Sequence, residues 1–192
     1  MKVDVSSSLG NISKRLAQLQ HDIQDKVMSR TLNKVAAGAL GKMSSAISED
    51  YMITKKQASE KLRITKATAT AGRFYMQATL YSPTNGKRKG FNLIRFISGR
   101  RVIGGKGKPQ LKFKIKRGGG TVSIPGAFIG NAGRTVFIRT GKGRQPIKAV
   151  TTIDVPQMFN SRKVNNRVVE YIRERLPIVA QQEINNVLRA RS

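Results

Sequence analysis

The chain has 192 residues, of which 39% are hydrophobic, and 37 Lys and Arg against 10 Asp and Glu give it a formal net charge of +27. It contains no cysteine, which excludes disulfides, thiolate nucleophiles and sulfur-ligated metals. No apolar run approaches the about 18 residues that a membrane span needs, and the length suits one folded domain, 1–192.

The N-terminal part, 1–62, has helical periodicity. Apolar residues recur at spacings of three and four at Leu9, Ile12, Leu16, Leu19 and Ile23. This pattern predicts a seam about two heptads long, which packs either within the subunit or against a neighbouring subunit.

Further helix is predicted after this seam. A second apolar stripe runs from Leu32 to Ile47, and its small residues at 35–40 allow another helix to approach closely. Residues 8–50 then form either one helix or two. Thr54 and Gln57 have the spacing of a capping box, which predicts a short helix over 54–62.

The middle part, 63–153, has the pattern of strands separated by glycine, because 14 of the 18 glycines lie between Gly86 and Gly143. The predicted strands are 73–81, 91–97, 110–116, 121–124, 135–139 and 147–153. The Asn-Gly pair within 82–90 predicts a hairpin. The basic sheet region is therefore expected to be antiparallel.

Two of these strands raise a question of function. In "QLKFKIK" (110–116) Leu, Phe and Ile alternate with three lysines, which predicts a buried face and a row of ammonium groups opposite it. "KGFNLIRF" (89–96) matches much of an RNA-stacking strand, but that fold needs a helix directly before this strand. A hairpin signal precedes it instead, so an ordinary sheet strand is the favoured interpretation.

The C-terminal part, 154–192, returns to a helical period after Pro156. Pro177 lacks the N–H that would bond back one turn, so it is expected to break or kink this helix. A last stretch with Val179 and Ile184 continues the period. The predicted fold class is α+β, with N-terminal helices, a central basic antiparallel β-sheet region and a C-terminal helix.

The sequence offers no basis for catalysis. Clustered acids are absent from the middle of the chain, and the single histidine, His21, has no partner for acid–base work. "GRRVIGGKGK" (99–108) resembles a phosphate loop, but Gly105 stands where that motif needs lysine. We expect a protein that is not an enzyme and has no catalytic residue, metal or cofactor.

The charge is concentrated in the middle part. No Asp or Glu lies between Glu60 and Asp154, whereas 21 of the 37 Lys and Arg do. A single basic run is ordinarily a solvated face, but these runs have no acids nearby to pair them. The candidate contacts to an anionic partner are Lys87, Arg88, Lys89, Arg100, Arg101, Lys106, Lys108, Lys112, Lys114, Lys116, Arg117, Arg139, Lys142 and Arg144.

The class of that partner stays open at this point. A nucleic-acid backbone and an acidic protein surface would both supply the negative charge. Nothing in the pattern suggests that bases are read, because glycine-flanked lysines make phosphate contacts, which position a protein without specifying a sequence.

Three ordered segments carry a resemblance to a known family: "SIPGAFIGNAGRTVFIRTGKGRQPI" (123–147), "VPQMF" (155–159) and "RERLP" (173–177). They resemble the minor tail protein Z family of long-tailed bacteriophages, and the resemblance covers most of the chain in order. Within the first segment, Pro125 and Gly126 predict a turn, followed by a buried strand opening at 127–129. Arg139, Lys142 and Arg144 are expected to project from the next hairpin.

The resemblance implies a structural role in the virion, at the head-proximal end of the tail, after assembly in the bacterial host cytoplasm. It implies that the protein completes the tail, joins it to the head and positions the DNA end. The implied partners are tail terminator and tail tube proteins, head-completion or connector proteins, and phage DNA. A tail is rotationally symmetric, so a homo-oligomeric ring is expected, with a hexamer favoured.

A rival hypothesis is a free basic nucleic-acid-binding protein of ribosomal or nucleoid type. It predicts tight binding by an isolated monomer and recovery with RNA or chromosomal DNA, whereas the tail hypothesis predicts recovery with tail particles.

Overall fold

The computed structural model describes residues 17, 21–68, 77–82, 90–101 and 110–190. Its elements in chain order are α2 (His21–Asp50), α3 (Lys55–Ser59), β1 (Arg63–Thr65), β2 (Thr79–Tyr81), η2 (Leu93–Phe96), β3 (Ile97–Arg101), β4 (Gln110–Phe113), β5 (Val122–Ser123), β6 (Phe128–Gly130), β7 (Thr135–Arg139), β8 (Ile147–Ala149), α4 (Val155–Phe159) and α5 (Arg162–Arg189). Helices therefore flank small antiparallel sheets, and the predicted α+β class is confirmed.

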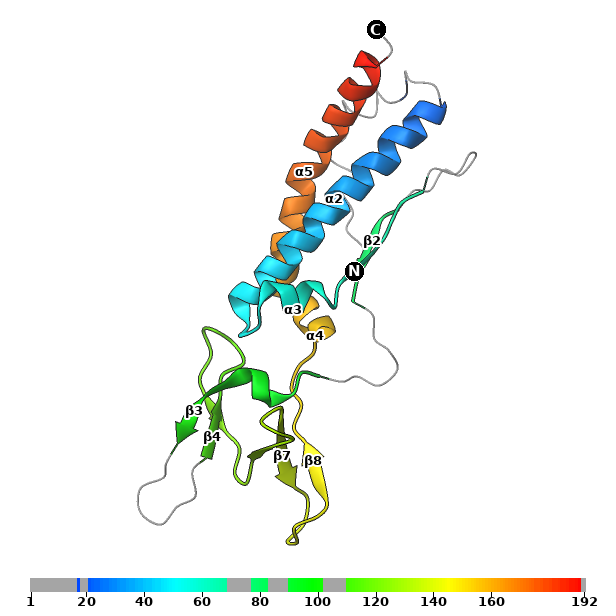
Figure 1. The fold of residues 1–192 in the computed structure, drawn as a ribbon. Coiled ribbons are helices and arrows are strands. Elements are labelled where there is room, and N and C mark those ends of the chain that lie inside the picture. The colour runs from blue at the N-terminus through cyan, green and yellow to red at the C-terminus, as the bar shows by residue number, and fades with distance from the viewer. Residues whose placement is uncertain (1–16, 18–20, 69–76, 83–89, 102–109, 191–192) are drawn as a thin grey trace.

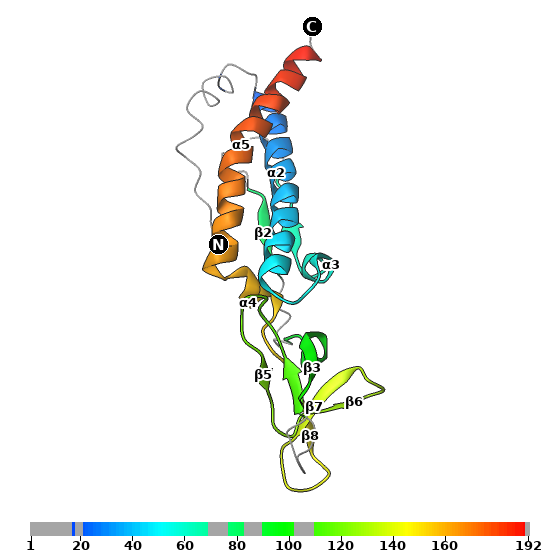
Figure 2. The ribbon, with the colours of Figure 1, turned by 90° about the vertical axis from the view of Figure 1, so that its left-hand side faces the viewer.

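The two long helices, α2 and α5, lie side by side (Figures 1 and 2). They extend away from strands β3 to β8, whereas β2 lies alongside α2. Most of the predicted stripe on α2 is buried, although Leu32 and Leu40 are only half-buried. Gly38 permits the close approach that the small residues predicted, because a Cβ there would lie 2.0 Å from the Tyr171 hydroxyl of α5. Gly38 thus leaves room for the Tyr171 side chain between the two helices.

From His21 onward the chain forms one helix of 30 residues, which answers the question of one helix or two for this portion. Of the predicted seam, Leu9, Ile12, Leu16 and Leu19 lie outside the described residues. Ile23 is buried beside Ala180 and Ile184 of α5, so at this position the packing is within the subunit.

Of the break or kink predicted at Pro177, the break is wrong, because the 28-residue helix α5 has Pro177 in its interior. The kink stays a prediction. Proline removes one intrahelical hydrogen bond. On the C-terminal side, however, Val179, Ala180 and Ile184 are buried, and this packing stabilises the helix beyond the proline.

The short helix α3 confirms the capping-box prediction. Gln57 N donates to Thr54 Oγ1 (3.2 Å), and Thr54 N donates to the Gln57 side chain (3.1 Å). Strand β1, only three residues long, was not predicted, and it pairs with β2. Only the end of the predicted strand 73–81 is therefore seen as β2, while 69–76 and the hairpin residues 83–89 lie outside the described residues.

The predicted strand 91–97 is wrong. Leu93–Phe96 form the 3₁₀ helix η2, and strand β3 begins only at Ile97. Leu93 and Phe96 are both buried, and a spacing of three places them on one side of a 3₁₀ turn but on opposite faces of a strand. The RNA-stacking interpretation of this segment is overturned as well, because it requires a strand here.

Asn92 fixes η2 to strand β7. Its side-chain oxygen accepts from Ile94 N (3.0 Å) and Val136 N (2.9 Å), and its amide nitrogen donates to Val136 O (3.3 Å). The Asn92 side chain thereby supplies the acceptor for the backbone N–H of Val136. Val136 is fully buried, so this N–H has no access to water.

We expect Asn92→Ala to lower the free energy of unfolding by about 2–3 kcal/mol, because it leaves the buried Val136 N–H without an acceptor. Urea unfolding followed by circular dichroism measures this loss. The matched control is Asn166→Ala on the exposed side of α5, where we expect a change below about 0.5 kcal/mol. Equal midpoints for the two variants would contradict the role assigned to Asn92.

The remaining strands form two three-stranded antiparallel sheets, β3-β4-β5 and β6-β7-β8. Strand β7 matches the prediction 135–139 residue for residue, while β5 and β8 are shorter than 121–124 and 147–153. The predicted turn at Pro125–Gly126 is confirmed by the positive φ of Gly126 (72°). Strand β6, predicted as buried, is only half-buried along its length.

Strand 110–116 was predicted too long. Leu111 and Phe113 are buried as expected, but β4 ends at Phe113. Beyond it, Lys114 N donates to the η2 residue Phe96 O (2.8 Å), and Lys116 forms an isolated bridge with Tyr51. The chain therefore leaves the sheet after Phe113 and turns toward the end of α2.

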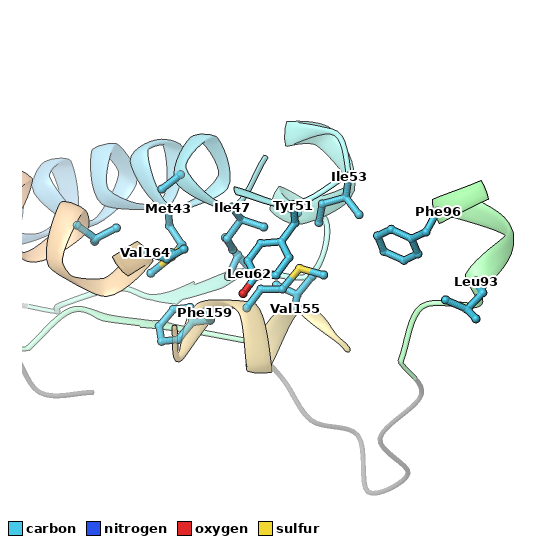
Figure 3. Close-up of a cluster of buried hydrophobic side chains, with 14 of the residues drawn as sticks. Met43, Ile47, Tyr51, Ile53, Leu62, Leu93, Phe96, Val155, Phe159 and Val164 are labelled. Atoms are coloured by element: carbon cyan, nitrogen blue, oxygen red, sulfur yellow. The ribbon is translucent and has the colours of Figure 1, made fainter. Parts of the chain in front are cut away.

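One hydrophobic cluster joins the helical part to the β part. Figure 3 shows Tyr51 and Ile53, just after α2, between Met43 and Ile47 on one side and Phe96 of η2 on the other. Val136 of β7 belongs to the same cluster. The sheets β3-β4-β5 and β6-β7-β8 are thus anchored on the end of the α2–α5 pair.

Candidate anion-binding surface

Ion pairs and unpaired cations occupy different parts of the molecule. The ion pairs join α2 to α5: Lys34 with Glu183, Lys163 with Asp50 (2.8 Å) and Arg167 with Glu49 (2.8 Å). Among the described residues, no Lys or Arg of 61–153 lies within 4.0 Å of a carboxylate oxygen. The described cations of the basic region thus take no acid from the helices and keep their positive charge.

The β7–β8 hairpin presents three of the predicted contacts at the end of the molecule opposite the helix tips (Figure 1). Its loop is closed by Thr140, whose N–H and hydroxyl donate to Pro146 O (3.1 and 3.2 Å). Arg139, Lys142 and Arg144 are all exposed, as predicted. Neither Lys142 nor Arg144 has a side-chain hydrogen bond or ion pair among the described residues, so both are available to a partner.

The lysines of the former strand 110–116 are less accessible than predicted. Lys112 lies in the central strand β4, opposite Gly99 of β3 and Ser123 of β5, and is half-buried. Lys114 is also half-buried, and only Lys116 is exposed. The prediction of a continuous row of ammonium groups along one strand is therefore wrong, because the strand ends before Lys114.

Two predicted contacts also have partners inside the chain. Arg117 Nε donates to Ser48 O (2.8 Å), and Arg117 N donates to Asp50 O (3.0 Å), which satisfies carbonyls at the C-terminus of α2. The last turn of α2 has no basic residue of its own, so Arg117 supplies the positive charge favoured there. Lys116 Nζ lies 5.9 Å from the centre of the Tyr51 ring.

The other predicted contacts lie where the structure gives no side chain. Lys87, Arg88, Lys89, Lys106 and Lys108 are outside the described residues. Arg100 and Arg101 belong to strand β3, with only their backbone described. For these seven, as for the other seven, contact with an anionic partner stays a prediction.

An aromatic pair beside the hairpin escaped the sequence analysis. The rings of Phe128 and Phe137 lie 6.0 Å apart, and the guanidinium carbon of Arg139 lies 5.0 Å from the centre of the Phe128 ring. The alternation in β7 carried the signal, because Phe137 and Arg139 have opposite parity to the buried Val136. Arg134 and Lys148 add two exposed cations that were not predicted as contacts.

This arrangement leaves Arg139, Lys142 and Arg144 exposed to solvent at one end of the molecule. In the described part of the chain there is no group of three His, Cys, Asp or Glu residues that would hold a metal ion. In the same part, no helix has the length and apolar character to cross a membrane.

Comparison with known proteins places the chain in a family. The family described as prophage minor tail protein Z matches residues 9–191. No curated protein and no solved structure matches the chain.

Proposed function

Because the chain belongs to the prophage minor tail protein Z family, and so is a phage minor tail protein, we propose that it completes the head-proximal end of the tail. In this role it joins the tail to the head and holds the end of the DNA in place. Its role is structural and not enzymatic. Its partners are the tail terminator, tail tube and head-completion or connector proteins, together with phage DNA.

The observation that carries this proposal is the separation of charge within the chain. Residues 61–153 hold 21 basic residues and no acid, and the described ion pairs all lie between the helices. A surface of this kind is stabilised by negative charge from a neighbour, and a head–tail junction offers both acidic subunits and DNA.

A ring of identical copies, with a hexamer favoured, suits a rotationally symmetric tail. The α2–α5 pair and strands β3 to β8 then lie at different levels of the junction, because they occupy opposite ends of the subunit (Figure 1). Each copy contributes one β7–β8 hairpin, so the ring multiplies a modest contact per copy by avidity. Family membership favours this role over a free ribosomal or nucleoid protein.

The proposal is tested by interrupting the gene in the phage and supplying the chain from a plasmid. Without the chain, we expect electron micrographs to show full-length tails and filled heads that are not joined. With it, joined particles return. Normal numbers of joined particles in its absence would contradict the proposal.

A further inference from the structure

The outward face of sheet β6-β7-β8, which carries the half-buried Phe128 and Phe137, packs in neither hydrophobic cluster of the described residues. The register places Phe128, Phe137 and Ala149 in one row across the three strands, and Arg139 opposite Ile147 in the next. The opposite face carries Ile129 and Val136, which pack in the main hydrophobic cluster. Neither Phe128 nor Phe137 belongs to either cluster, and Ile147 is 38% exposed.

This outward face is built with side chains held in place. A Cβ on Gly130 would lie 3.1 Å from the Phe137 ring, so the glycine lets that ring lie flat against β6. The Phe128 ring lies close to both the Phe137 ring and the Arg139 guanidinium. Figure 2 shows the β6–β7 hairpin projecting to one side of the other strands.

Cations surround this apolar centre. Arg134 lies at the β6–β7 turn, and Arg139, Lys142 and Arg144 lie at the other end of β7, all of them exposed. Paired aromatic residues with arginine at the centre, surrounded by charge, form the composition of protein–protein contact sites. A surrounding ring of one sign selects a partner of the opposite sign.

We propose that the outward face of sheet β6-β7-β8 docks an acidic subunit of the tail or head that is not a copy of this chain. This inference rests on the proposed function, because the partner is a component of the same particle. Two copies meeting through this face would bring four cations against four others. Duplex phosphates make no use of the two phenylalanines, and Arg139 covers the Phe128 ring against stacking by an unpaired base.

A photo-crosslinking experiment in assembled particles tests this docking surface. Phe137→p-benzoylphenylalanine puts the probe at the centre of the face, and Ile147→p-benzoylphenylalanine provides a second position should the first variant fold poorly. Tyr81→p-benzoylphenylalanine is the control, because Tyr81 is an aromatic residue, 41% exposed, on the separate sheet β1-β2. After irradiation, mass spectrometry identifies the cross-linked molecule and the segment attached.

We expect the probes in β7 and β8 to cross-link a different particle protein within a segment of net negative charge. Adding Arg139→Glu should lower that yield about tenfold, whereas Arg139→Lys should keep most of it. A cross-link to DNA, to a second copy or to a segment without acids overturns the inference, as does a yield no higher than that from Tyr81. If purified particles lack the chain, the proposed function falls as well.

Discussion

Changing Lys142 and Arg144 together to Glu is expected to reduce the number of joined particles at least about 30-fold. Both side chains are exposed in the β7–β8 loop and have no acidic partner among the described residues. Reversing two charges turns attraction to an anionic neighbour into repulsion. Each exposed charge contact contributes roughly 0.2–1 kcal/mol, and its reversal adds a repulsion of similar size. For two residues the loss is therefore about 2 kcal/mol per copy, or about 30-fold, and a ring compounds it.

The matched control reverses two cations elsewhere on the surface. Lys55→Glu with Lys56→Glu makes the same change in net charge at exposed positions of α3. Both positions lie at the N-terminus of this helix, where an acidic side chain is stabilising. Joined particles are counted by electron microscopy for both double variants, after circular dichroism shows that each is folded. An equal fall for both would mean that total charge matters and the hairpin does not.

Gly90→Ala is expected to destabilise the fold by about 2–4 kcal/mol, lowering the melting temperature by roughly 10 °C. A Cβ at this position would lie 1.7 Å from Thr152 O, which is a backbone atom. The two segments are held together there by hydrogen bonds from Thr152 N to Phe91 O (2.8 Å) and from Phe91 N to Ile153 O (3.5 Å). The methyl group would force these backbones apart, and thermal unfolding measures the cost.

Gly141→Ala is the control for this substitution. Its Cβ would meet no atom within 4 Å, so we expect its melting temperature to stay within about 2 °C of the parent. If Gly90→Ala and Gly141→Ala had the same melting temperature, the close approach of the two backbones would have no bearing on stability.

Local signals in the sequence predicted one helix start, one turn and one strand correctly. The capping box at Thr54, the turn at Gly126 and the bounds of β7 depend on residues close together in the chain, and all three are as predicted. Exposure of Arg139, Lys142 and Arg144 followed from the same reasoning, because a hairpin loop must lie at the surface.

The errors arose where distant residues decide the local structure. Residues 91–97 are apolar and aromatic, as in a strand, but Asn92 bonds to Val136 of β7 and caps a 3₁₀ turn instead. Arg117 was predicted as one more free cation, yet its Nε donates a hydrogen bond to the carbonyl of Ser48, 69 residues earlier, in the last turn of α2. Neither contact leaves a mark within a short window of sequence.

The central claim is that the basic β region takes its negative charge from a neighbour in the particle. A cryo-electron microscopy map of the intact head–tail junction, at a resolution that shows side chains, tests it most directly. The account predicts that Arg139, Lys142 and Arg144 lie within hydrogen-bonding distance of carboxylates of another subunit or of DNA phosphates. If all three pointed into open solvent in every copy, the claim would be contradicted.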